Sequence, residues 1–213
     1  MATPRTSGDR VWQRMPQGWI EFRSFGDRTP QEWLDRYLAG GDGWLPDDAR
    51  AAIVAGFHAG VAAFEGTDFD SAGVSITLGE RPAVSFLCTN VVRVAAGTDA
   101  PSLEFHRLFP LARFGVDSAA ETFTAPDGRV GTVASGTLEL GGRAVVTTVG
   151  EIRLPAGDGT ILVMGMCTDT GERTELAVLT AFTLSTTQVL PDGVEPAPLE
   201  ASASGSDLPH AVA

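Results

Sequence analysis

Lysine is absent from this sequence of 213 residues, and the 15 basic residues, all arginine, are outnumbered by 27 acidic residues. The net charge is −12, and the arginines occur singly along the chain. Binding to nucleic acid needs cationic groups that neutralise phosphates, and a membrane-surface helix needs a basic face. We therefore expect neither nucleic acid nor an anionic membrane surface as a partner.

Cysteine is also scarce, with only Cys88 and Cys167. Two cysteines cannot form a four-ligand zinc site or a disulfide framework. Each lies in an apolar run, where a free thiol usually packs as a small hydrophobic group. No run of about 18 apolar residues is present, so no membrane-spanning helix is expected. The N-terminal residues do not resemble a secretory signal. We expect a cytoplasmic protein with no metal and no cofactor.

Histidine, the usual general base, occurs three times. His210 falls in the C-terminal tail, and His58 borders the apolar face of an expected helix. His106 is the remaining candidate, and it could act as the base for Cys88 or Ser85 if the fold brings them together. No nucleophile elbow or phosphate-binding loop is present. A cysteine or serine hydrolase is therefore our third function hypothesis, and we expect a protein without catalysis.

The composition, 43% hydrophobic and 20% charged, is that of one globular domain. Residues 1–14 contain little apolar surface and are predicted to be a flexible tail. Residues 191–213 are rich in proline, alanine, serine and acidic residues and are predicted to be disordered. The domain is then expected to span residues 15–190.

Three helices are predicted. The first begins with Thr29 as N-cap, Pro30 at the first helical position and Glu32 three residues after the cap. The second begins around residues 46–48 and ends by Gly66. The last follows Asp169, and its expected apolar stripe consists of Leu176, Leu179, Phe182 or Thr183, and Val189.

Strands fill most of the remaining sequence. Residues 19–25 are predicted as a short strand, 73–95 as a hairpin that turns at 79–82, and 122–168 as a meander of three strands. The third strand of the meander is apolar at both parities and is predicted to be central, with both faces covered. Residues 101–119 match no element.

The register of the meander decides which side chains share a face. We expect a three-residue loop, 141–143, which pairs Leu138 with Val146 and Val130 with Leu154. The neighbours Ala134–Gly150 and Gly136–Thr148 would then leave a hollow in the core face. Either a closely packed helix fills it, or it is a pocket for a hydrophobic ligand or a partner's helix. The residues of this binding hypothesis are Val130, Ala134, Gly136, Leu138, Val146, Thr148, Gly150 and Ile152.

The order of elements predicts an α+β fold, an antiparallel sheet with helices packed on it. The segment GGRAVVTTVGEIRLPAGDGTILVMGMCTDTGERTELAVLTAFTLSTTQV resembles the LpqN-type branch of the PsbP-like fold over roughly residues 128–190. Its Gly-Gly-Arg hairpin, "LPAGDG" turn, apolar strand and closing helix carry that resemblance. The resemblance implies a binding or assembly factor rather than an enzyme. The helix-grip fold has the same order of elements and is the structural alternative.

Two functions lead. The first is a binding or assembly module, an adaptor or chaperone for a protein partner. The second is a carrier, or a helix-grip enzyme, for an apolar small molecule. A carrier needs an enclosed pocket, whereas an adaptor needs an exposed apolar patch or an edge strand. All four tryptophans lie within the first 44 residues; they complete a core or, where exposed, anchor a partner.

Overall fold

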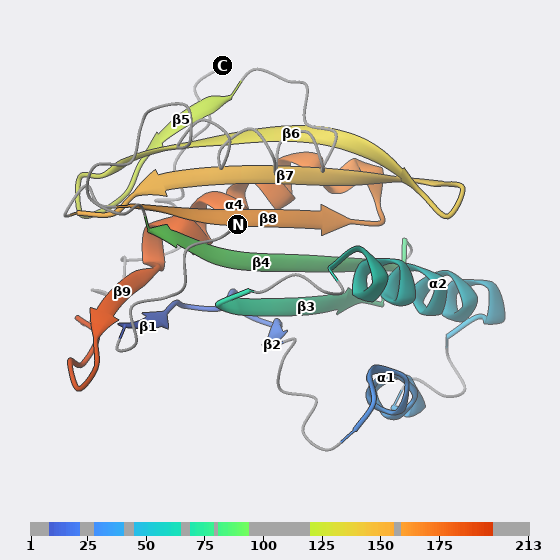
Figure 1. The fold of residues 1–213 in the computed structure, drawn as a ribbon. Helices are drawn as coiled ribbons and strands as arrows, with labels where there is room; N and C mark the ends of the chain where they lie inside the picture. Colours follow the sequence, from blue (N-terminus) through green and yellow to red (C-terminus); the bar gives the residue numbers. More distant parts are fainter. Residues whose placement is uncertain are drawn as a thin grey trace.

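A seven-stranded antiparallel sheet forms the centre of the molecule, in the order β2-β3-β4-β8-β7-β6-β5 (Figure 1). The structure is a computed structural model and describes residues 9–21, 28–40, 45–64, 69–78, 81–93, 120–155 and 159–197. The strands are β2 (Ile20–Glu21), β3 (Ser71–Thr77), β4 (Ala83–Arg93), β5 (Glu121–Thr124), β6 (Val130–Leu140), β7 (Arg143–Arg153) and β8 (Gly159–Cys167). A second sheet pairs β1 (Asp9–Trp12) with β9 (Gln188–Pro191).

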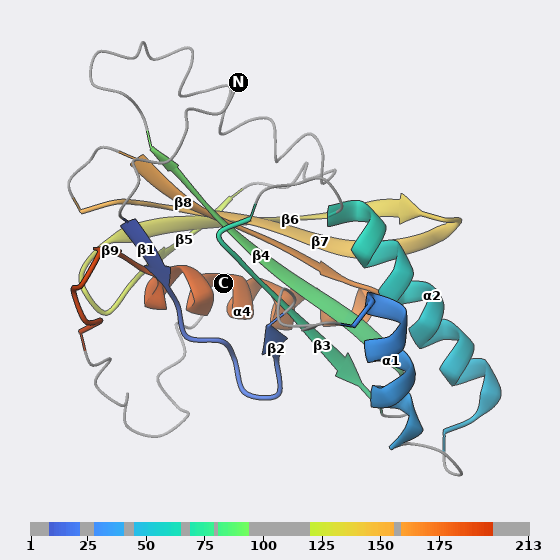
Figure 2. The same cartoon turned by 60° about the horizontal axis from the view of Figure 1, so that its bottom comes forward.

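Helices cover both faces of the large sheet, which confirms the predicted α+β class. The helices α1 (Pro30–Ala39) and α2 (Asp47–Phe64) pack on one face, and α4 (Arg173–Thr186) packs on the other after the short 3₁₀ helix η1 (Thr170–Glu172). Figure 2 shows α1 and α2 side by side at one end of the sheet. No helix within the described ranges is long and apolar enough to cross a membrane.

The start of α1 is the capping box that the sequence predicts. The backbone N–H of Glu32 donates to the Thr29 hydroxyl at 3.2 Å, and the backbone N–H of Thr29 donates to the Glu32 carboxylate at 2.8 Å. The carboxylate and the hydroxyl thus accept hydrogen bonds from backbone N–H groups that have no acceptor within the helix. The hairpin of β3 and β4 and the three-strand meander of β6, β7 and β8 are likewise confirmed.

The expected register of the meander is wrong by one residue. Leu140 pairs with Arg143, so the loop is the two residues Gly141 and Gly142, both with positive φ. Positive φ at both positions is the geometry of a type I′ turn, which glycine adopts at little cost. Leu138 therefore pairs with Val145 instead of Val146. Even-numbered residues of β6 and of β7 now lie on opposite faces of the sheet.

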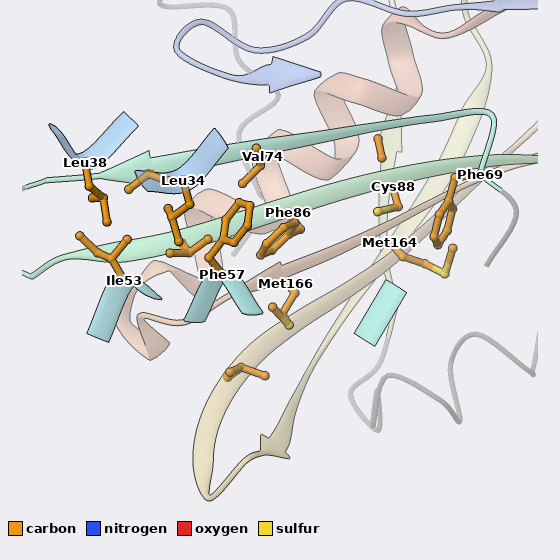
Figure 3. Packing of buried hydrophobic residues seen from close by; sticks show 14 of the residues in the cluster. Leu34, Leu38, Ile53, Phe57, Phe69, Val74, Phe86, Cys88, Met164 and Met166 are labelled. Carbon is orange, nitrogen blue, oxygen red and sulfur yellow. The ribbon is translucent and has the colours of Figure 1, made fainter. Parts of the chain in front are cut away.

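The two faces hold separate cores. On the α1–α2 face, Phe57 of α2 lies beside Phe86 of β4, with 6.1 Å between ring centroids (Figure 3). On the α4 face, Leu176 and Leu184 are buried against β6, β7 and β8. β8 lies between β4 and β7 and is almost wholly buried, so its prediction as a central strand is confirmed.

Close packing of α4 depends on small side chains beneath it. A Cβ on Gly150 would lie 2.6 Å from Leu184 Cδ1 and 2.9 Å from Thr180 Cγ2. Thr180 donates to the Leu176 carbonyl, so the Thr148 hydroxyl, 2.7 Å from that of Thr180, acts as its donor. The predicted stripe of α4 is right at Leu176 and Thr183, which are buried, and at Leu179, which packs half-buried against the same core. Thr180, Ala181, Leu184 and Thr186 complete the buried face, and Val189 lies in β9.

Residues 13–19 cross the α4 face of β3 and β4 as a strap, which joins β1 to β2. Asp9–Trp12, part of the segment predicted as a tail, pair with β9. Gln13 then donates to the Ser71 hydroxyl at 2.9 Å and accepts from the Thr89 hydroxyl at 2.7 Å. Met15 lies against Gly73, where a Cβ would collide with its methyl group. The strap is therefore fixed to the sheet at several points.

Candidate binding cleft

A cleft of about 350 Å³ lies on the α4 face of the sheet and opens to solvent on one side. It lies between α4 and the strap, at the end of the sheet where β3 turns into β4. Its lining comes from four parts of the chain: the strap (Gln17, Trp19), the β3–β4 hairpin (Ser75, Thr77, Arg81, Ala83, Ser85), the end of β8 (Cys167), and η1 with α4 (Glu172, Glu175, Leu176, Leu179).

The floor of the cleft follows from the strand pairing. Ser75 of β3 pairs with Ser85 of β4, and Ser85 pairs with Cys167 of β8. Residues that pair across antiparallel strands point to the same face. Two hydroxyls and a thiol therefore lie in one row across three adjacent strands. The row can donate and accept hydrogen bonds, and Ala83 beside it adds an apolar contact.

The thiol in this row is held in its neutral form. Burial raises the pKa of the Cys167 thiol, and a hydrogen bond with the Ser85 hydroxyl offsets this only in part. A cysteine is nucleophilic as the thiolate, which needs a positive neighbour or a base. No histidine lines the cleft in the part of the chain that the structure describes, and His58 is exposed on α2.

The two alternative nucleophiles, Ser85 and Cys88, lie on opposite faces of the sheet. Ser85 lines the cleft on the α4 face, whereas Cys88 is buried in the core on the α1–α2 face (Figure 3). His106 lies outside the described residues. Cys88 and Ser85 thus have the sheet between them, and one base could serve only one of them.

The hollow predicted from the register is not formed, because α4 fills the space over Gly150. The eight residues of that hypothesis divide between the faces. Val146, Thr148, Gly150 and Ile152 face α4, while Ala134, Gly136 and Leu138 face the other way. Val130 is 63% exposed. Any binding role of these residues stays a prediction, but they do not line a single pocket.

The charges at the rim of the cleft are unequal. The Arg81 guanidinium lies 3.5 Å from the Asp169 carboxylate, which also accepts the Gly171 backbone N–H at 2.8 Å. Glu172 is half-buried and Glu175 is exposed, and neither forms an ion pair with another described residue. The one arginine of the cleft is thus matched by Asp169, and two carboxylates remain.

Several residues of the cleft escaped sequence reasoning. Leu179 was expected on an apolar stripe, Trp19 in a core or as an anchor for a partner, and Glu172 as a helix cap. Trp19 and Leu179 do pack against the α4-face core, and all three residues also line the cleft. No local pattern shows this, because the lining comes from residues as far apart as 17 and 179. Ser85 was singled out, although as a nucleophile. Within the described ranges, no three histidine, cysteine or acidic side chains lie together as a metal site would require.

No protein-family model and no curated protein matches the chain. Among solved structures, LpqN of Mycobacterium tuberculosis, described as involved in cell envelope biogenesis, is 11% identical, with a TM-score of 0.44 over 87% of this chain and 86% of that chain. A protein of unknown function from Pseudomonas aeruginosa is 15% identical, with a TM-score of 0.33 over 52% of this chain and 76% of that chain. Both are weak structural resemblances, and neither shows a PsbP-like fold.

Proposed function

We propose that this protein is a non-catalytic binding module, an adaptor or chaperone, whose cleft between α4 and the strap holds a segment of a partner protein. The observation that carries the proposal is the lining of the cleft. Apolar side chains (Trp19, Leu176, Leu179) stand beside a row of hydroxyls and two carboxylates, and one side is open. Such a surface can bind an apolar side chain and, at the same time, the polar backbone on either side of it.

An enclosed carrier site has less support. The hollow that a carrier would use is filled by Leu184 and Thr180 of α4. The cleft that does exist is lined by charged and polar groups as well as apolar ones, which suits a segment that keeps contact with water.

A hydrolase also has less support, because the hydroxyl and thiol in the cleft lack an activating base among the described residues. The raised pKa of the Cys167 thiol is opposite to what a nucleophile needs. Both cysteines are free and buried, and reduced thiols of this kind support a cytoplasmic location for the module.

The test is to fill the cleft and measure binding of peptides. Ser75 is half-buried on the floor of the cleft, so Ser75→Phe should occupy the cleft while the sheet remains paired. Thr122→Phe, on the exposed β5, is the matched control. A displayed library of random nine-residue peptides is selected on the full-length protein, and individual peptides are then measured by fluorescence polarisation on all three proteins.

We expect selected peptides to bind the original protein and Thr122→Phe equally and to bind Ser75→Phe at least tenfold more weakly. Circular dichroism and thermal melting establish that both variants are folded. The proposal fails if no peptide is selected, or if the selected peptides bind Ser75→Phe as tightly as the original protein. Native mass spectrometry that shows a retained apolar small molecule, displaced by Ser75→Phe, would favour the carrier instead.

A further inference from the structure

We infer that the cleft selects partner segments in which an arginine or lysine stands two residues from a large apolar residue. This inference rests on the proposed function and names the chemistry of the partner. It starts from the division of the α4 wall into two halves. Glu172 and Glu175 form the half near the start of the helix, and Leu176 and Leu179 form the half one turn further on.

Helix geometry fixes how far apart these halves lie. Residues three or four apart in a helix share a face, so each pair presents two side chains to the cleft. The midpoints of the two pairs are four residues apart, which corresponds to about 6 Å along the helix axis. Alternate side chains of an extended segment point the same way and are about 7 Å apart. Two such side chains therefore match the acidic half and the apolar half.

Trp19 makes the apolar half selective for a large side chain. It comes from the strap and lines the same cleft as the half-buried Leu179 and the buried Leu176, so an apolar group in the cleft meets both the helix side chains and the indole ring. A large side chain removes more apolar surface from water there than a small one.

The acidic half favours a cation for two reasons. Arg81 is already matched by Asp169, so Glu172 and Glu175 have no cation among the described residues. The chain as a whole carries a charge of −12, which draws basic segments towards it and repels acidic ones. An anion at the start of η1 and α4 would instead meet Asp169, Glu172 and Glu175, which already occupy that end of the helix.

The acids also offset the positive end of the helix dipole, and the test must separate this structural role from recognition. Glu175→Arg reverses one charge of the acidic half, and Glu172→Gln removes the other. Glu139→Gln is the matched control, because Glu139 is exposed on β6 and does not line the cleft. The random nine-residue library is selected on each full-length variant, and the binders are sequenced.

On the original protein and on Glu139→Gln, we expect peptides that depend on the cleft to carry arginine or lysine two residues from leucine, phenylalanine or tryptophan. This pair should be enriched at least fivefold over the unselected library. On Glu175→Arg, acidic residues should replace the basic ones at that position. On Glu172→Gln, basic peptides should bind three- to tenfold more weakly and associate more slowly, with a smaller dependence on salt.

The outcomes separate this inference from the proposed function. Some selected peptides could depend on the cleft, because Ser75→Phe does not bind them, and yet carry no basic residue. Such peptides would overturn the inference and leave the proposed function standing. Unchanged selection on Glu175→Arg would overturn it as well, because a purely structural role predicts lower stability without a change of sequence preference. Absence of any peptide that depends on the cleft would overturn both.

Discussion

Three positions in β4 separate Ser85 from Cys88, and this odd spacing sends their side chains to opposite faces of the sheet. Ser85 reaches the cleft, whereas Cys88 is enclosed in the α1–α2 core. The alternation of side chains along β4 therefore decides which of these two residues reaches the solvent-open cleft. The same rule brings Cys167, paired with Ser85, to the cleft floor.

The state of the Cys167 thiol can be measured directly. Cys88→Ala leaves Cys167 as the single cysteine, and its alkylation by iodoacetamide at pH 8 should be at least tenfold slower than that of glutathione. Burial raises the pKa of this thiol, so little thiolate is present. Unfolding in urea should restore the rate of a free thiol. A rate in the folded protein equal to that of glutathione would contradict this and revive the hydrolase hypothesis.

The raised pKa also predicts how stability depends on pH. The folded state holds the thiol proton more tightly than the unfolded state does. The contribution to stability is therefore complete below about pH 8.5, the ordinary pKa of a thiol, and is lost as the pH rises from there through the folded pKa. Urea unfolding of the Cys88→Ala protein and of Cys88→Ala/Cys167→Ala at pH 7 and pH 9.5 measures it. The double variant should lose less stability between these pH values, and an equal loss would contradict the linkage.

Gly150 gives a second test at the scale of one residue. Under the carrier hypothesis, leucine at position 136 or 150 should abolish ligand uptake from a hollow. The structure instead predicts that Gly150→Leu lowers the free energy of unfolding by roughly 1–3 kcal/mol or more, because the new side chain collides with Leu184 and Thr180. Val130→Leu, at a position that is 63% exposed, should change it little. Equal stability of the two variants in urea unfolding would show that the space over Gly150 is empty.

At the scale of the element, the capping box of α1 is the clearest local signal in the sequence. Thr29→Ala should lower the free energy of unfolding by about 1 kcal/mol, because the Glu32 backbone N–H loses its acceptor. Thr174→Ala, exposed on α4, is the control and should have little effect. Thermal or urea unfolding at pH 7 measures both changes. An equal effect of the two substitutions would indicate that the cap does not hold α1 in the folded protein.

The carboxylate partner of this cap adds a pH dependence. Hydrogen bonds from the Thr29 backbone N–H and then from its hydroxyl lower the pKa of Glu32. The stability that the carboxylate provides is therefore present above its ordinary pKa and lost as the pH falls through the folded pKa. We expect the difference between Thr29→Ala and the original protein to shrink in acid, which urea unfolding at pH 7 and pH 3 would show.

The helix cap was predictable because it depends on neighbours in sequence. The register of β6 and β7 depended on a choice between two signals, the turn residues and the alternation of side chains in the strands. Gly141-Gly142 is a strong signal for a two-residue turn. The alternation of small and apolar residues in the flanking strands favoured the longer loop. That alternation was misleading, since β7 is buried on both faces from Val145 to Gly150 and its parity carries little information. The turn residues were the better guide.

At the scale of the whole molecule, the cleft exists because distant segments are tied together. Its walls come from the strap and from α4. β1 directly precedes the strap, β9 directly follows α4, and these two strands pair with each other. The sequence could not predict this, because four-residue strands at the two ends of the domain have no periodic pattern to match. The predicted boundaries, a domain of 15–190 between two tails, would separate β1 from the fold that the structure shows.

Gln13 tests whether the strap is part of that fold. Its amide accepts from the Thr89 hydroxyl, which is fully buried, and donates to Ser71. Gln13→Ala leaves the Thr89 hydroxyl without that acceptor, which should lower the free energy of unfolding by about 1–3 kcal/mol. Gln17→Ala, exposed in the same strap, should leave stability unchanged.

Trypsin offers an independent measurement, because Arg14 is exposed and follows Gln13 directly. A protease needs the chain to leave the sheet locally before it can cleave. Cleavage after Arg14 should therefore be slow in the original protein and several-fold faster in Gln13→Ala, while Gln17→Ala behaves like the original. Rapid cleavage of the original protein would mean that residues 1–14 form a tail, as the sequence suggested. Trp19 follows the cleavage site and stays joined to β2, but the strap would then be held at its β2 end alone, and peptide binding should fall with the same cleavage.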